Sequence, residues 1–135
     1  MSTLLVLEDE SALMKLLRHM LKQHSLLEAS SADEALHLFA DRNQPIDLLL
    51  ADVTLPTSSG IQVALLLRSQ IPGLPVILTS GYPVNGWSDR DSADLRRLGS
   101  TSVAILQKPF LSKVLSHTVG DLLTGSPQSA TARTA

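Results

Sequence analysis

Several residue types are missing or rare in this chain of 135 residues, and each absence excludes a class of protein. There is no cysteine, which excludes a disulfide framework, a thiolate nucleophile and a cysteine-ligated zinc site. The aromatic residues are one tryptophan, one tyrosine and two phenylalanines, too few for a platform that stacks single-stranded nucleic acid or sugars. The core must therefore be aliphatic.

Long apolar runs and a charge of one sign are also absent. No run approaches the roughly 20 apolar residues of a transmembrane helix, and no basic segment precedes an apolar one at the N-terminus, as in a secretory signal. The net charge is −2 and the 11 lysine and arginine residues are scattered, which disfavours direct binding of nucleic acid. We expect a cytoplasmic chain without membrane insertion, long enough for one domain.

Five short apolar segments, each suited to a buried strand, alternate with segments of helical character. The expected strands are Thr3 to Leu7, Leu26 to Ala29, Ile46 to Ala51, Val76 to Thr79 and Val103 to Leu106. The expected helices run from about Leu13 to His24, from Ser31 past Phe39, from Ile61 to Ser69, from Asp91 to Leu98 and from Leu111 to Leu123.

Local signals support two of these helices in particular. The first has an apolar stripe with helical spacing, made of Leu13, Leu16, Leu17, Met20 and Leu21. The second opens on Ser31-Ala32-Asp33-Glu34, which has the S-x-x-E form of a capping box. Gly99 is suited to end the fourth helix.

The alternation predicts an α/β fold, a (βα)5 doubly wound parallel sheet with helices on both faces, because crossovers between parallel strands are right-handed. One domain is expected over residues 1–124, followed by a small polar tail, residues 125–135, that is expected to be disordered. In such sheets ligands bind beyond the carboxyl ends of the strands.

Charged and hydroxyl side chains follow four of the predicted strands. They are Glu8 and Asp9, then Asp52, then Thr79 and Ser80, and finally Lys108. Taken alone, each acid is more often a solvated loop residue. Together, three carboxylates at one edge repel one another, which favours a cation among them, and oxygen ligands favour Mg²⁺. Lys108 is suited to hold a phosphoryl oxygen, and the Thr79 hydroxyl to donate to another.

The chain resembles the receiver domains of two-component signalling, from about Thr3 to Thr124. The resemblance is carried by LLVLEDE (Leu4 to Glu10), DLLLADVTLP (Asp47 to Pro56) with Gly60, VILTSGY (Val76 to Tyr82) and LQKPF (Leu106 to Phe110). It implies a flavodoxin-like sheet with strand order 2-1-3-4-5, as in single-domain response regulators of the chemotaxis type. It also implies a signalling phosphoacceptor rather than an enzyme with an external substrate.

The resemblance further implies roles for individual residues. Asp52 would accept a phosphoryl group from a phosphohistidine of a histidine kinase or a histidine phosphotransfer protein. Mg²⁺ would be bound by Asp9, Asp52 and the backbone carbonyl of Thr54, with Glu8 acting through a metal-bound water. Phosphoryl binding and switching would involve Thr79, Ser80 and Lys108, and the changed surface would dock a downstream protein or a second copy of the chain.

Two features depart from the family pattern. Many receivers carry Tyr or Phe three residues before the lysine, whereas this chain has Ile105, so a switch here would work through packing or through different partner recognition. The segment from Thr79 to Lys108 is also long and polar, and Trp87 within it is expected to be a local packing residue. The histidines show no metal-ligand spacing and are assigned no role.

Two other functions compete with the phosphoacceptor. A hydrolase of the haloacid dehalogenase kind would need a second Asp two positions after Asp52, where this chain has Thr54, and would need a cap insertion. A pseudo-receiver that is never phosphorylated is disfavoured by the intact acids and lysine. The start at Met1, just before the first strand, favours a stand-alone protein over a receiver excised from a hybrid kinase.

Overall fold

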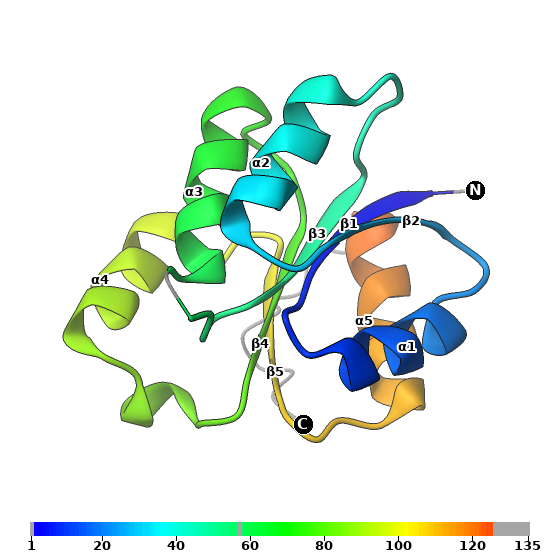
Figure 1. Cartoon of the computed structure of the whole chain (residues 1–135). Helices are drawn as coiled ribbons and strands as arrows, with labels where there is room; N and C mark the ends of the chain where they lie inside the picture. Colours follow the sequence, from blue (N-terminus) through cyan, green and yellow to red (C-terminus); the bar gives the residue numbers. More distant parts are fainter. Residues whose placement is uncertain (1, 57, 126–135) are drawn as a thin grey trace.

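The computed structural model describes residues 2–56 and 58–125, and within this part five strands alternate with five α-helices (Figure 1). The strands are β1 (Thr3–Leu7), β2 (Ser25–Ala29), β3 (Leu48–Asp52), β4 (Val76–Ser80) and β5 (Val103–Gln107). The helices are α1 (Ser11–Met20), α2 (Ala32–Asp41), α3 (Gly60–Gln70), the short 3-10 helix η1 (Val84–Gly86), α4 (Asp89–Leu98) and α5 (Ser112–Leu123). None of these helices has the length and apolar character needed to cross a bilayer.

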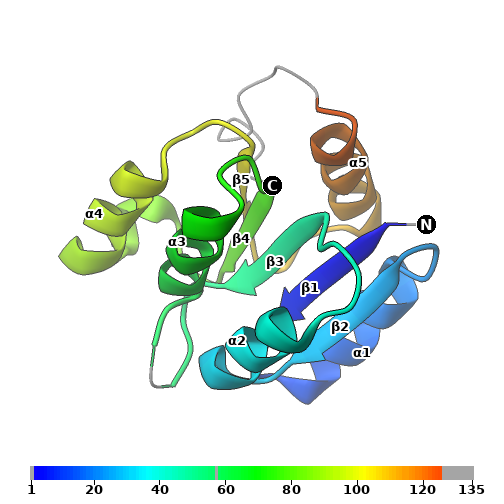
Figure 2. The ribbon, with the colours of Figure 1, turned by 90° about the horizontal axis from the view of Figure 1, so that it is seen from above.

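All five strands are parallel and lie in the order β2-β1-β3-β4-β5, which confirms the predicted fold. Helices α1 and α5 cover one face of the sheet, and α2, α3 and α4 lie on the other side (Figure 1, Figure 2). Because the strands point the same way, their carboxyl ends meet at one edge, and residues that follow different strands come together there.

Alternate strand residues enter two aliphatic clusters, one on each face of the sheet. In β1, Leu5 and Leu7 belong to the cluster under α2 and α3, whereas Leu4 and Val6 belong to the cluster under α1 and α5. Burial of each such side chain stabilises the fold by about 1.5–3 kcal/mol, so both faces of the strands must be apolar. Polar chemistry is thereby confined to the strand ends.

The third strand and the first helix differ from the prediction. β3 begins at Leu48 rather than Ile46, and Asp47 just before it contacts the start of β1: its carboxylate accepts the N–H of Thr3 at 2.8 Å. Helix α1 ends at Met20, and Leu16, predicted to face the core, is 55% exposed. One residue turns a helix by about 100°, so Leu16 faces outward when Met14 and Leu17 face the sheet.

Two predicted helix-end signals, the capping box at Ser31 and the stop at Gly99, are found in the structure, the first with one change. The Ser31 hydroxyl accepts the N–H of Glu34 at 3.1 Å, as a capping box requires. The Glu34 carboxylate, however, accepts the N–H of Ser30 at 2.6 Å instead of that of Ser31. Gly99 ends α4 with a φ of 84°, a conformation that glycine adopts without strain.

The predicted loop after β4 is partly ordered into η1, and α4 begins at Asp89, two residues before the prediction. Ser88 caps α4, since its hydroxyl accepts the N–H of Asp91 at 3.1 Å. Of the predicted tail, residues 126–135 lie outside the described part of the chain.

Gly60 allows α3 to begin directly against the end of β3. A methyl group at this position would overlap the backbone carbonyl oxygen of Asp52 and would lie 2.8 Å from the Cβ of Ala51. The close approach of the two backbones therefore requires glycine, and it places Asp52 relative to α3.

Gly60→Ala is expected to lower the free energy of unfolding by about 1–3 kcal/mol, because the strand or the helix must move to admit the methyl group. Urea denaturation measures the change. Gly73→Ala is the matched control, since a methyl group at Gly73 meets no atom within 4 Å. Equal stability of the two variants would contradict the interpretation.

Candidate functional site

The carboxyl edge of the sheet brings together residues from four strand ends. Glu8 and Asp9 follow β1, Asp52 is the last residue of β3, Thr79 and Ser80 end β4, and Lys108 follows β5. Strands β1, β3, β4 and β5 are successive neighbours in the sheet, so these residues are close in space. Up to 100 positions separate them in the sequence, as for Glu8 and Lys108.

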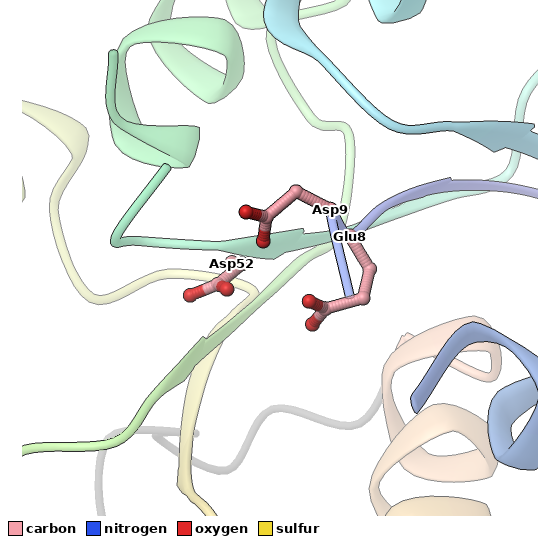
Figure 3. Close-up of side chains that lie close together, drawn as sticks. All are labelled: Glu8, Asp9 and Asp52. Atoms are coloured by element: carbon pink, nitrogen blue, oxygen red, sulfur yellow. The ribbon is translucent and has the colours of Figure 1, made fainter. Parts of the chain in front are cut away.

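Three carboxylates form the acidic part of the site. One oxygen from each of Glu8, Asp9 and Asp52 lies within 4.8 Å of the others, and the three side chains converge from two adjacent strands (Figure 3). Glu8 and Asp52 are buried, at 3% and 4% exposure, whereas Asp9 is exposed. The cluster therefore opens to solvent on the side of Asp9.

Lys108 bridges the two buried acids. Its Nζ lies 3.0 Å from Oε1 of Glu8 and 3.0 Å from Oδ2 of Asp52, so one ammonium group contacts a carboxylate from each of two strands. Such charge-assisted contacts satisfy groups that would otherwise be buried without a partner. The peptide bond between Lys108 and Pro109 is cis.

Backbone donors orient the two buried carboxylates. Oδ1 of Asp52 accepts the N–H of Thr54 at 3.0 Å, which leaves Oδ2 for Lys108. Oε2 of Glu8 accepts the N–H of Glu10, also at 3.0 Å. The two acids are thus held by one backbone contact and one lysine contact each.

Burial and charge shift two pKa values at the site. Burial raises the pKa of Glu8, and this effect outweighs the lowering by the N–H of Glu10 and by Lys108. Burial also acts to lower the pKa of Lys108, but the hydrogen bonds and charges of Asp52 and Glu8 together exceed it, so the pKa of Lys108 is raised. The lysine is therefore cationic at neutral pH.

The hydroxyl residues of β4 have separate surroundings. Thr79 is buried and pairs in register with Asp52, and its carbonyl accepts the N–H of Val53 at 2.9 Å. Ser80 is fully buried, and its hydroxyl accepts the N–H of Tyr82 at 3.0 Å and the indole N–H of Trp87 at 3.1 Å. The phosphoryl-binding roles of both residues remain predictions.

Ile105 and Trp87 lie on the same side of the sheet. Ile105 is 4% exposed within the cluster under α2 and α3, and Trp87 packs against that cluster, which confirms its predicted packing role. The isoleucine fills space in the core and presents no side chain to a partner. Its part in switching remains a prediction.

Sequence reasoning missed the contacts that depend on backbone geometry. The N–H donors of Glu10 and Thr54 carry no residue signature, because any residue except proline supplies one. The bond from Trp87 to Ser80 was missed too, since it depends on the path of the loop after β4. The predicted acids, Thr79 and Lys108 are brought to one edge.

Two cavities adjoin the site. One, of about 270 Å³, extends from Glu8 and Asp9 between α1 and β2 toward the ion pair of Arg18 with Glu28. The other, of about 380 Å³, is lined by Glu10, Leu13, Leu16, Met20, Lys108, Pro109 and Phe110. Lys108 thus belongs both to the acidic site and to an apolar surface groove.

The arrangement supports chemistry on an anionic group. The buried Asp52 carboxylate is held beside an ammonium group, and the neighbouring acids, of which Asp9 is exposed, could hold a divalent cation. Oxygen ligands of this kind suit Mg²⁺, especially where a phosphoryl group adds further oxygens.

Comparisons with known proteins agree with this geometry. The profile of one family, described as response regulator receiver domain, matches residues 4–119. The chain is 30% identical to the sensor kinase CckA of Brucella abortus, over 90% of this chain and 12% of that protein. It is 32% identical to the response regulator protein FleR of Pseudomonas aeruginosa, over 87% of this chain and 25% of that protein.

A solved structure shows the same fold. The response regulator receiver protein from Sinorhizobium medicae WSM419 aligns with a TM-score of 0.77 at 25% identity, over 94% of this chain and 97% of that one. By contrast, the chain spans less than a third of the two curated relatives above, so the similarity to them concerns one module of each.

In the metal-free protein, Glu8→Gln is expected to raise the free energy of unfolding near pH 8, since burial disfavours the ionised carboxyl. A carboxyl whose folded-state pKa is raised contributes stability that is present below its ordinary value of 4.5 and is lost as pH rises through the folded-state pKa. The advantage of the variant should therefore shrink as pH falls toward 4.5.

Urea denaturation with a chelator between about pH 4.5 and pH 8 measures this difference. Glu10→Gln is the matched control, because Glu10 is exposed and only its backbone N–H contacts Glu8. An advantage of Glu8→Gln that grows on acidification would contradict the assigned effect of burial.

Proposed function

Since the chain belongs to the response regulator receiver domain family of two-component signalling, we propose that Asp52 accepts a phosphoryl group from a phosphohistidine. The donor would be a histidine kinase or a histidine phosphotransfer protein. The observation that carries the proposal is the Asp52 carboxylate, buried at a sheet edge, with Lys108 at 3.0 Å and two further acids beside it.

The proposed transfer forms one bond and breaks one. A carboxylate oxygen of Asp52 attacks phosphorus, an O–P bond forms, and the P–N bond breaks with its electron pair going to the imidazole nitrogen of the donor. Dephosphorylation would end the signal: a water oxygen attacks phosphorus, the O–P bond to Asp52 breaks, and inorganic phosphate and the free Asp52 carboxylate are formed. The chain would promote only these reactions of its own Asp52.

Residues around Asp52 would each do a part of this chemistry. The N–H of Thr54 holds one carboxylate oxygen, and Lys108 would place its charge on the incoming phosphoryl group. The Thr79 hydroxyl would donate to another phosphoryl oxygen. These contacts fix the geometry before transfer, which is the main contribution a protein makes to phosphoryl chemistry.

Receiver domains generally bind Mg²⁺ at an acidic pocket, and the residues of this chain fit that ion. Asp9, Asp52 and the carbonyl of Thr54 would hold it, and Glu8 would act through a metal-bound water. When bound, Mg²⁺ neutralises charge on the transferring group. The fit rests on the convergence of three carboxylates within 4.8 Å beside a single lysine.

Treatment with acetyl phosphate and Mg²⁺ is expected to add about 80 Da to the wild-type chain, because an aspartyl phosphate forms. Intact mass spectrometry measures the adduct, which should be labile and absent in Asp52→Asn. Asp41→Asn, an exposed carboxylate at the end of α2, is the matched control and should keep the adduct.

No adduct in the wild type would overturn the proposal and support an unphosphorylated pseudo-receiver. Repeated turnover of a phosphomonoester would instead support the hydrolase alternative.

An apolar face beside Lys108 supports docking of a donor protein. The groove of about 380 Å³ is formed by Leu13, Leu16 and Met20 of α1 with Pro109 and Phe110, and it is continuous with the site through Lys108. Leu16 is 55% exposed. A protein that brings its histidine to Asp52 must cover the surface around the site, so this face would meet the donor.

Leu16→Glu is therefore expected to slow phosphoryl transfer from a purified phosphohistidine protein by about tenfold, since a charge replaces an apolar contact of roughly 1.4 kcal/mol. Phosphorylation by acetyl phosphate should be unchanged. Leu66→Glu is the matched control, because Leu66 is 53% exposed on α3, which packs on the other face of the sheet. Equal slowing by both variants would exclude docking at α1.

A further inference from the structure

Trp87, the only tryptophan of the chain, is hydrogen-bonded to the end of β4. Its indole Nε1 donates to the hydroxyl of Ser80 at 3.1 Å and to the carbonyl of Tyr82 at 3.2 Å. The ring is half-buried and packs against the cluster under α2 and α3. The position of the Trp87 ring is thus set by packing, and its orientation is set by the hydrogen bonds of the indole N–H.

Ser80 connects this indole to the phosphoacceptor site. It is fully buried, and its hydroxyl accepts both the indole N–H and the N–H of Tyr82. Its carbonyl accepts the backbone N–H of Lys108 at 2.7 Å. Ser80 therefore bonds to the loop after β4 through its side chain and to the backbone of Lys108 through its main chain.

The contacts form a continuous chain of four residues. Trp87 holds Ser80, Ser80 holds the backbone of Lys108, and the Nζ of Lys108 lies 3.0 Å from Asp52. Contiguous hydrogen bonds between buried groups can couple two positions, and measured non-additivity shows whether they do. Misplacement of a charged group by about 1 Å is enough to change a rate strongly.

We propose that Trp87 is a positioning residue for the chemistry of Asp52, acting through Ser80 on Lys108. The inference rests on the proposed function of Asp52 as phosphoacceptor. With the indole N–H in place, the end of β4 and the backbone of Lys108 are held in one arrangement. Phosphorylation, which draws the ammonium group of Lys108 onto the new oxygens, in turn changes the surroundings of the indole.

The rate of phosphorylation by acetyl phosphate with Mg²⁺, followed by intact mass, tests the positioning role. Trp87→Phe keeps an aromatic ring but removes the N–H donor, and Ser80→Ala removes the acceptor. Each is expected to slow the initial rate roughly threefold to tenfold. Both variants remove the bond between Trp87 and Ser80, so the two slowing factors should not multiply in the double variant, although each variant also loses one bond to Tyr82.

Tyr82→Ala is the matched control. It removes an exposed ring from the same loop and keeps the backbone carbonyl and N–H that bond to Trp87 and Ser80, so its rate should equal that of the wild type. Wild-type rates in Trp87→Phe and Ser80→Ala, or slowing effects that multiply in the double variant, would overturn the inference.

Tryptophan fluorescence gives a second readout that a packing role alone would not move. In the wild type, emission from Trp87 should change with the same time course as the mass adduct, and in Ser80→Ala the change should fall by more than half. An adduct without any emission change overturns the inference, even where a variant fails to fold. The absence of any adduct in the wild type would instead overturn the proposed function.

Discussion

The contact of one lysine with two buried carboxylates is the interaction on which the functional edge depends. Both faces of the strands are apolar, so charged residues of this sheet are placed at the strand ends. Because the strands are parallel, these ends lie close together. Glu8 and Asp52 would repel each other there without Lys108. The same cation lies where the proposed phosphorylation of Asp52 would add further negative charge.

The candidate site residues that lie at strand ends could be predicted from the sequence. Asp52 and Lys108 were predictable because a buried apolar run stops at each of them, and parallel strands deliver their ends to one edge. The orientation of Leu16 was predicted wrongly, since its spacing fits an apolar stripe but the side that meets the sheet is set by Met14 and Leu17. The bond between Trp87 and Ser80 could not be predicted, because loop paths have no periodicity to read.

The comparisons place this architecture within larger proteins of different organisation. A sensor kinase and a response regulator protein both contain a segment similar to this chain, and in each the segment is a minor part of the length. The similarity covers 90% and 87% of this chain, so it includes most of the sheet that brings the acids and Lys108 together.

The candidate site is also spread widely along the chain, since Lys108 lies 100 residues after its partner Glu8. The first four strands can emerge from a ribosome before β5 exists, and until β5 pairs with β4 the lysine is not beside Asp52. A partly synthesised chain therefore lacks the ion pairs that join Lys108 to Glu8 and Asp52. The candidate site is completed only when the last strand of the sheet has paired.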